Sequence, residues 1–180
     1  DLQKFYNGLS PQLVTYIEAL RSCKNLNETD KIFGAMYLHM QEPKTDLANM
    51  KSIEKIPETV HKNLSYKGLF LEDEKAHLAN GKYHLHDAVY SQKEVDLLLD
   101  YNKRLYRSAA KQIRKGNFLI NPYSQDSKSV QGEQLKAITH FEADRHMPYA
   151  RKLYQLPRKE KRQGFLALMQ SKKEEEGNDL

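Results

Sequence analysis

A long predicted helix over residues 92–115 constrains the fold of this chain more than any other feature. Ser91 is a good N-cap for it, and Gly116 is the residue type that ends a helix in the left-handed conformation at C′. Apolar residues recur at helical spacing along it and predict a buried stripe, which must pack against another part of the chain. The stripe consists of Val95, Leu98, Leu99, Leu105, Ala109 and Ile113.

Basic side chains form a ridge beside this stripe in the second half of the helix. They follow each other at steps of three, four, three and one residues, so they share one face. Phosphate contacts made by such a ridge would be independent of sequence and sensitive to salt. The alternative is that Lys and Arg fill these turns because they suit the helix dipole and keep the helix soluble. The ridge, predicted to face DNA, consists of Arg104, Arg107, Lys111, Arg114 and Lys115.

A second predicted helix places a glutamine and a tyrosine on one face. Ser10 is a suitable N-cap and Pro11 a suitable first helical residue, and the apolar spacing extends the helix to about Lys24. Gln12 and Tyr16 lie four residues apart, so they are neighbours on the helix surface. An amide and a phenol can position a phosphate oxygen, a metal-bound water or a stacked base. The alternative is that Tyr16 packs on the core while Gln12 is solvated.

The rest of the pattern predicts an α+β fold. Residues 32–40 are apolar and contain aromatic residues, which predicts a strand long enough to be central in a sheet. The apolar residues at 165–169 could form a partner-binding helix, whereas the charged residues 171–180 are predicted to be disordered. We also expect a strand at 66–71, short helices at 57–64 and 72–80, a loop at 121–129 and one or two short helices within 133–155.

Composition restricts the class of protein. The chain has 180 residues, 39% of them hydrophobic and 29% charged, which is enough for one modest core. No run of about 18 apolar residues and no signal peptide is present, so neither a membrane span nor secretion is indicated. The single Cys23 suits a reducing cytoplasm. A net charge of +5 favours polyanions mildly, and no P-loop is present, so ATP binding must reside elsewhere.

Two groups of histidines are weak candidates for metal ligands. His84 and His86 could bind zinc from a strand, but no second pair of ligands is visible, so a solvated hairpin or mobile loop is the preferred interpretation. A second group alternates along the chain and shares one face only in a strand, whereas residues 134–143 fit a helix equally well. We therefore predict no metal site here. The second group is His140, Glu142, Asp144 and His146.

The segment Phe5-Tyr6-Asn7-Gly8-Leu9-Ser10-Pro11-Gln12-Leu13-Val14-Thr15-Tyr16 resembles the last nuclease motif, Gln-x-x-x-Tyr, of the RecB-like nucleases. It is most similar to that motif in the B subunits of bacterial AddAB/RexAB helicase-nucleases. Residues 33–43, 66–71 and 116–123 resemble, in the same order, the following strand, the next extended piece and the close of the long helix in those subunits. The resemblance covers residues 1 to about 155 and implies a C-terminal fragment of a larger protein.

The resemblance implies a parent enzyme that hydrolyses phosphodiester bonds with Mg²⁺, together with a helicase-nuclease A subunit, at DNA ends in double-strand-break repair and recombination. In such nucleases a His, an Asp, an Asp or Glu and a Lys precede the Gln-x-x-x-Tyr helix, and this chain begins after them. Gln12 and Tyr16 are therefore carried over only as supporting active-site residues, and the fragment itself is expected to be inactive. The alternative is a non-catalytic module that docks DNA or the partner subunit.

Many AddB-type subunits hold an iron–sulfur cluster with cysteines in a stretch that aligns with residues 131–144. No cysteine lies there, so we expect no cluster and a closer match to the RexB branch. The resemblance implies part of the mixed sheet of a PD-(D/E)xK nuclease core with an α-helical C-terminal cover. The expected domains are residues 1–125 from the nuclease domain, a helical cover at 126–157 and a partly disordered tail at 158–180.

Overall fold

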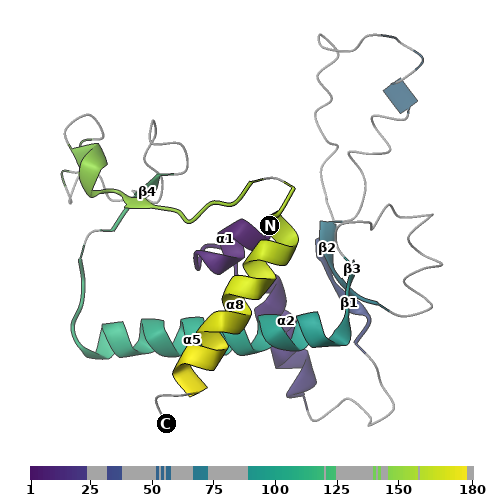
Figure 1. Ribbon diagram of the computed structural model, residues 1–180, viewed down its shortest axis with the longest axis horizontal. Coiled ribbons are helices and arrows are strands. Elements are labelled where there is room, and N and C mark those ends of the chain that lie inside the picture. Colours follow the sequence, from purple (N-terminus) through teal and green to yellow (C-terminus); the bar gives the residue numbers. More distant parts are fainter. Residues whose placement is uncertain are drawn as a thin grey trace. The chain divides into compact units, whose positions relative to one another are not determined.

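The computed structural model describes residues 1–23, 32–37, 52, 54, 56–57, 67–72, 89–119, 121–124, 140, 142, 146–157 and 159–177. It divides into two compact units, one of Asp1–Ser10 with Lys103–Leu180 and the other of Pro11–Asn102. Helices are combined with two small sheets, so the predicted α+β class is confirmed (Figure 1).

The unit Pro11–Asn102 contains a mixed three-stranded sheet. Strand β1 (Gly34–Tyr37) runs antiparallel to β2 (Lys67–Leu71), and β2 runs parallel to β3 (Val89–Tyr90). The strand order is β1-β2-β3, so among the described strands β2 is central and β1 is at an edge. The strand predicted at 32–40 is confirmed over Gly34–Tyr37, but apolar composition does not reveal how many neighbours a strand has. Residues 38–40 lie outside the described residues.

Helix α2 (Gln12–Arg21) carries the predicted glutamine and tyrosine. It buries Val14 and Ile17, as its apolar spacing indicated. The prediction of Ser10 as N-cap was wrong: Pro11 occupies the cap position, no side chain caps the helix, and the Pro11 carbonyl accepts the first helical bond from the Thr15 amide. The helix ends at Arg21, earlier than predicted.

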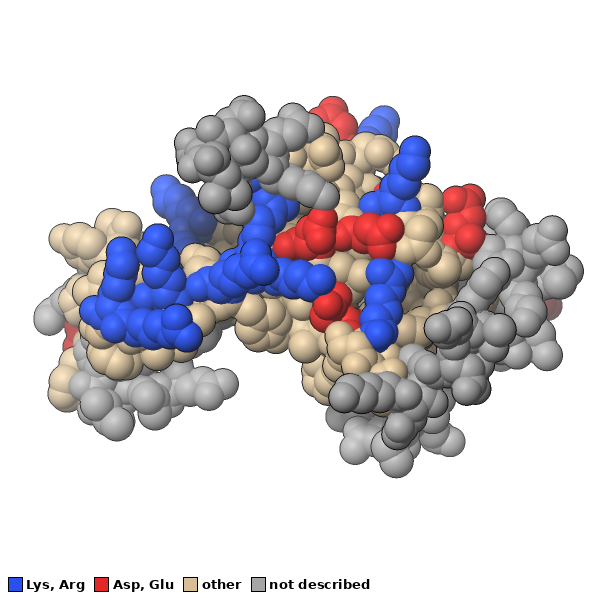
Figure 2. Space-filling model, turned by 90° about the horizontal axis from the view of Figure 1, so that it is seen from below, with Lys and Arg blue, Asp and Glu red and all other residues tan. Residues whose placement is uncertain are grey.

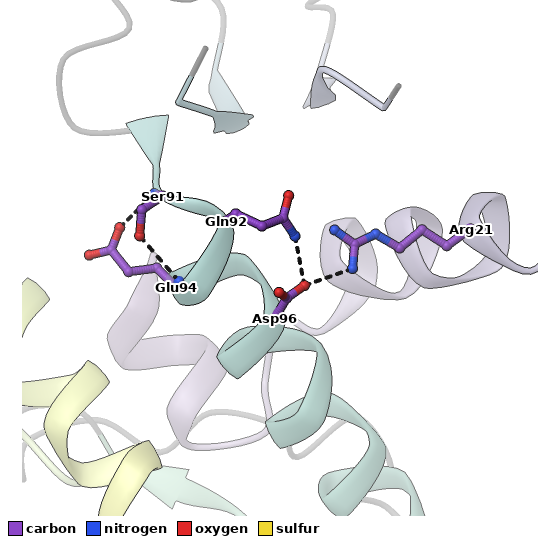
Figure 3. Close-up of polar contacts among 5 residues, drawn as sticks. All are labelled: Arg21, Ser91, Gln92, Glu94 and Asp96. Carbon is purple, nitrogen blue, oxygen red and sulfur yellow. Dashed lines mark hydrogen bonds and ion pairs between the residues drawn. The ribbon is translucent and has the colours of Figure 1, made fainter. Parts of the chain in front are cut away.

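Helix α5 (Gln92–Arg114) begins where the sequence predicted and ends one residue before the predicted Lys115. The Ser91 hydroxyl accepts a hydrogen bond from the Glu94 amide at 3.3 Å, and the Glu94 carboxylate accepts one from the Ser91 amide at 2.8 Å, which is a capping box (Figure 3). At the other end Gly116 has a φ of 68°. Its amide donates to the Ile113 carbonyl, and the next amide donates to the Gln112 carbonyl, as in a Schellman motif.

The buried stripe predicted for α5 is correct only in its first half. Val95, Leu98 and Leu99 are buried, whereas Ala109 is exposed and Ile113 is 64% exposed. Helical spacing shows which face is apolar, but it does not show whether another element covers the last turns. Leu105 is half-buried.

The other unit contains α1 (Leu2–Tyr6), the second half of α5, the 3₁₀ helix η4 (Met147–Tyr149) and α8 (Lys161–Gly177). Tyr6, Tyr154 and Phe165 form an aromatic cluster between α1 and α8, with ring centroids 5.2 Å apart for Tyr6 and Phe165. Phe165 and Met169 are completely buried. The face of α8 that the sequence assigned to a partner therefore packs within this unit.

The predictions for the last third of the chain were only partly correct. The 3₁₀ helix η4 lies in the region 133–155, where short helices were predicted, but strand β5 (Arg151–Lys152) also lies there and pairs in parallel with β4 (Tyr123–Ser124), which lies in the expected loop. Pairing of two-residue strands far apart in sequence leaves no periodic signal. The helix α8 also continues through residues 171–177, where disorder was predicted. The short helices predicted at 57–64 and 72–80 lie almost entirely outside the described residues.

Candidate functional site

Gln12 and Tyr16 are joined by a hydrogen bond on the surface of α2. The Gln12 Nε2 donates to the Tyr16 hydroxyl over 2.7 Å. Gln12 is exposed and the Tyr16 side chain is 50% exposed, so both groups remain accessible to a ligand. The structure therefore brings together the two residues that the sequence placed on one face, and it makes them a hydrogen-bonded pair.

A third residue, Tyr37, joins this pair from strand β1. Its hydroxyl donates to the Gln12 Oε1 over 3.1 Å, so the Gln12 amide bridges two phenols. Sequence reasoning placed Tyr37 in a strand but gave it no role. The contact depends on how β1 packs against α2, which no local spacing pattern contains.

Beside these side chains, α2 and β1 line an open, largely apolar surface hollow of about 550 Å³. The rings of Tyr16 and Tyr37 form part of its wall, and Leu20 and Met36 remain nearly half exposed there. Tyr16 is therefore neither buried in the core nor fully surrounded by solvent. The lining residues are Leu13, Tyr16, Ala19, Leu20, Cys23, Gly34, Ala35, Met36 and Tyr37.

Polar contacts with the first turns of α5 hold α2 in place. Asp96 accepts a hydrogen bond from Gln92 at 2.7 Å and forms an ion pair with Arg21 at 2.9 Å (Figure 3). Deeper in the unit, the buried Asn102 donates to the Thr15 hydroxyl at 3.1 Å. Because the Arg21–Asp96 pair is partly exposed, we expect it to contribute at most about 1 kcal/mol. Together these contacts fix the helix that carries Gln12 and Tyr16.

The basic ridge predicted on α5 consists of two kinds of residue. Arg104 is half-buried and donates to the Met169 carbonyl of α8 over 3.0 Å, so it serves packing within its unit. The other four side chains are exposed and, with Ala110, line a hollow of about 450 Å³. Figure 2 shows Lys and Arg gathered over the C-terminal part of α5. This exposed basic surface consists of Arg107, Lys111, Arg114 and Lys115.

The described residues contain no group of three His, Cys, Asp or Glu side chains that could hold a metal ion. His140 is exposed, and the His146 Nδ1 accepts a hydrogen bond from the Glu142 amide at 2.9 Å. Asp144, His84 and His86 lie outside the described residues. The Gln12–Tyr16–Tyr37 group offers neutral amide and hydroxyl groups, which suit hydrogen bonding to oxygen atoms. No helix in the described part of the chain is long and apolar enough to cross a membrane.

The whole chain is similar to one class of bacterial DNA-processing protein, although no family model matches it. It is 99% identical over 180 residues to the B subunit of the ATP-dependent helicase/deoxyribonuclease of Streptococcus mutans serotype c. It is 59% identical over 180 residues to the corresponding B subunit from Streptococcus agalactiae serotype III, and 55% identical over 170 residues, or 94% of the chain, to that from Streptococcus pyogenes serotype M12.

The chain spans only 17% of the length of the first of these relatives and 16% of the other two. The resemblance to B subunits of helicase-nucleases, first seen in the residues around Gln12 and Tyr16, is confirmed by these matches. The chain corresponds to a fragment of the B subunit of an ATP-dependent helicase/deoxyribonuclease.

Proposed function

We propose that this chain is the part of a B subunit that supports DNA cleavage through its Gln12–Tyr16 pair. The observation that carries the proposal is the 2.7 Å hydrogen bond between these two exposed side chains, in a chain similar along its whole length to helicase/deoxyribonuclease B subunits. The parent protein would act with an A subunit in the cytoplasm, on DNA ends in double-strand-break repair and recombination.

The pair acts by hydrogen bonding. Tyr16 accepts from the Gln12 amide, so its own hydroxyl hydrogen stays available to a phosphate oxygen or a water molecule. An amide and a phenol hydroxyl offer hydrogen-bond donors and acceptors, so the pair is suited to positioning groups. We assign it a supporting role beside the reacting phosphate.

The residues present do not fit a magnesium site. Mg²⁺ binds through carboxylates and water, whereas Gln12, Tyr16 and Tyr37 supply none of the carboxylates, and no acidic cluster of three occurs among the described residues. The metal ligands of a PD-(D/E)xK-type core would therefore come from other parts of the parent protein. On this proposal, the fragment alone should not cleave DNA. A RexB-type protein without an iron–sulfur cluster agrees with the single, exposed Cys23.

The test compares the full-length B subunit, in complex with its partner, as wild type, Gln12→Ala and Tyr16→Phe. Cleavage of labelled single-stranded DNA with Mg²⁺ or Mn²⁺ should fall by at least about tenfold in both variants, because a donor near the developing charge is lost. DNA binding should remain. Gln163→Ala and Tyr149→Phe change exposed residues of the same types in the other unit and should keep full activity.

Two outcomes would contradict the proposal. Full cleavage by Gln12→Ala and by Tyr16→Phe would reduce the pair to a structural role. Cleavage by the isolated fragment, measured in the same assay, would mean that the chain contains metal ligands of its own.

A second function is favoured by a different observation, the exposed basic surface of Arg107, Lys111, Arg114 and Lys115. Four cations around one hollow can neutralise several phosphates of a nucleic acid backbone. In this role the chain docks DNA, without contacts to base edges. The two functions are compatible, and the residues that carry them lie in different units of the chain.

A further inference from the structure

Gln12 is held from two sides, although it is an exposed side chain with three rotatable bonds. The Tyr16 hydroxyl receives its Nε2–H, and the Tyr37 hydroxyl donates to its Oε1. A long polar side chain on a helix surface normally samples several rotamers, and ordering it costs conformational entropy. The second contact, from β1, reduces this freedom before any ligand arrives.

We infer that Tyr37 is a positioning residue for the Gln12–Tyr16 pair. Its bond to the Gln12 oxygen gives the Gln12 amide a second anchor, so the Gln12 nitrogen is held beside the Tyr16 hydroxyl, which accepts from it and can donate to an outside oxygen atom. Without Tyr37 the amide has one anchor, and the Gln12 side chain would sample rotamers in which it no longer contacts Tyr16.

The position of Tyr37 is set by the sheet, which supports a fixed role. Tyr37 lies opposite Lys67 in the antiparallel pairing of β1 with β2, and Met36 lies opposite Gly68. Strand residues alternate between the two faces, so this register decides on which side of β1 the Tyr37 ring lies. The ring is 40% exposed and forms part of the wall of the hollow between α2 and β1. The hydroxyl therefore reaches Gln12 from a strand whose register is set by its pairing with β2.

This inference rests on the proposed function of the Gln12–Tyr16 pair, and its experiment separates the two. The full-length B subunit with its partner is prepared as wild type, Tyr37→Phe, Gln12→Ala and the double variant. Tyr37→Phe keeps the ring and removes only the donor. We expect kcat for cleavage of labelled single-stranded DNA to fall about three- to tenfold, the effect of one lost hydrogen bond, with KM and DNA affinity nearly unchanged.

The double variant tests whether Tyr37 acts by positioning Gln12 or only by stabilising the folded protein. If Tyr37 acts through Gln12, then adding Tyr37→Phe to Gln12→Ala should cause no further loss of kcat, because the group that it positions is already gone. Tyr149→Phe is the matched control, since Tyr149 is an exposed tyrosine of the other unit. The melting temperature of each variant, measured in parallel, checks that the protein is folded.

Each result has one meaning. A full kcat for Tyr37→Phe, together with a reduced kcat for Gln12→Ala, overturns the inference and leaves the proposed function standing. Equal losses from Tyr37→Phe in both backgrounds also overturn it, because Tyr37 then acts independently of Gln12. Full activity of Gln12→Ala and Tyr16→Phe overturns the proposed function itself.

Discussion

Asn7 joins the end of α1 to the segment before α8 through its side-chain amide. The Tyr154 amide donates to the Asn7 Oδ1 over 2.9 Å, and the Asn7 Nδ2 donates to the Tyr154 carbonyl over 3.1 Å. The same Nδ2 also donates to the Gln3 carbonyl at 2.8 Å. One side chain thus satisfies both backbone groups of Tyr154, as a neighbouring strand would.

Replacing Asn7 by Ala should therefore loosen the segment around Tyr154. Two hydrogen bonds to its backbone are lost, each worth about 1 kcal/mol, and the Tyr154 amide loses its acceptor. We expect amide exchange in a peptide covering residues 151–156 to become at least about fivefold faster, measured by mass spectrometry on the full-length protein. Asn117→Ala is the control, because its bond to the Gln112 side chain is local to the end of α5. Unchanged exchange in the Asn7 variant would contradict this function of the amide.

Side-chain roles could be predicted from the sequence only where they depend on local spacing. Gln12 and Tyr16 were found because their spacing of four residues on a helix is visible in the sequence. Tyr37 and Asn7 were not, because their partners, Gln12 and Tyr154, are brought to them by tertiary packing. Arg104 fits the basic ridge by spacing, yet it binds the Met169 carbonyl of α8.

Strands β1 and β2 approach each other closely at two glycines. A Cβ on Gly68 would meet the Ala35 carbonyl oxygen and would lie 2.8 Å from the Met36 Cα, and a Cβ on Gly34 would meet the Leu69 carbonyl oxygen. Backbone atoms cannot move aside as flexible side chains can. The pairing that positions Tyr37 thus requires residues without a Cβ atom at these two positions.

Gly68→Ala should therefore shift β1 and weaken the contact between Tyr37 and Gln12. We expect lower stability and a several-fold loss of DNA cleavage in the full complex, measured by thermal unfolding and by the cleavage assay. Gly116→Ala is a matched control. No atom lies within 4 Å of a Cβ there, but its φ of 68° should cost about 1 kcal/mol of stability while cleavage is kept. Equal effects of both changes on cleavage would disprove the link between the sheet and the pair.

The ends of α5, which carry local signals, were predicted well, whereas elements defined by pairing were not. Ser91 and Glu94 form the capping box at the start of α5, and Gly116 supplies the left-handed residue at its end, so both boundaries could be deduced. Pairing of β4 with β5 joins residues that are distant in sequence. The apolar residues of α8 were visible, but their partners on α1 were not.

At the scale of the whole molecule, the net charge of +5 is less informative than where the charges lie. The first turns of α5 carry Glu94 and Asp96, while its last turns carry exposed Lys and Arg side chains (Figure 2). Such a gradient along one helix creates a local positive field that attracts a polyanion more strongly than the same charges dispersed.

The exposed basic surface of Arg107, Lys111, Arg114 and Lys115 should therefore govern the salt dependence of DNA binding. Replacing Arg107, Lys111, Arg114 and Lys115 by Gln in the full-length complex should weaken binding and reduce the slope of log K against log salt, by about 0.9 for each contact to duplex DNA that is lost. Fluorescence anisotropy of labelled DNA between low and moderate salt measures the slope. Cleavage of DNA that is already bound should remain, because Gln12 and Tyr16 are unchanged.

The matched control removes the same number of positive charges from other exposed sites. Gln at Lys4, Lys93, Lys152 and Lys159 lowers the net charge equally; all four lysines are exposed, and Lys93, in the first turn of α5, lies outside the tested surface of Arg107, Lys111, Arg114 and Lys115. If binding depended only on net charge, both quadruple variants would show the same affinity and the same slope. A loss confined to the α5 variant would instead identify a local phosphate-binding surface, since counterions are released where the backbone is contacted. Equal slopes in the two variants would refute the docking function of α5.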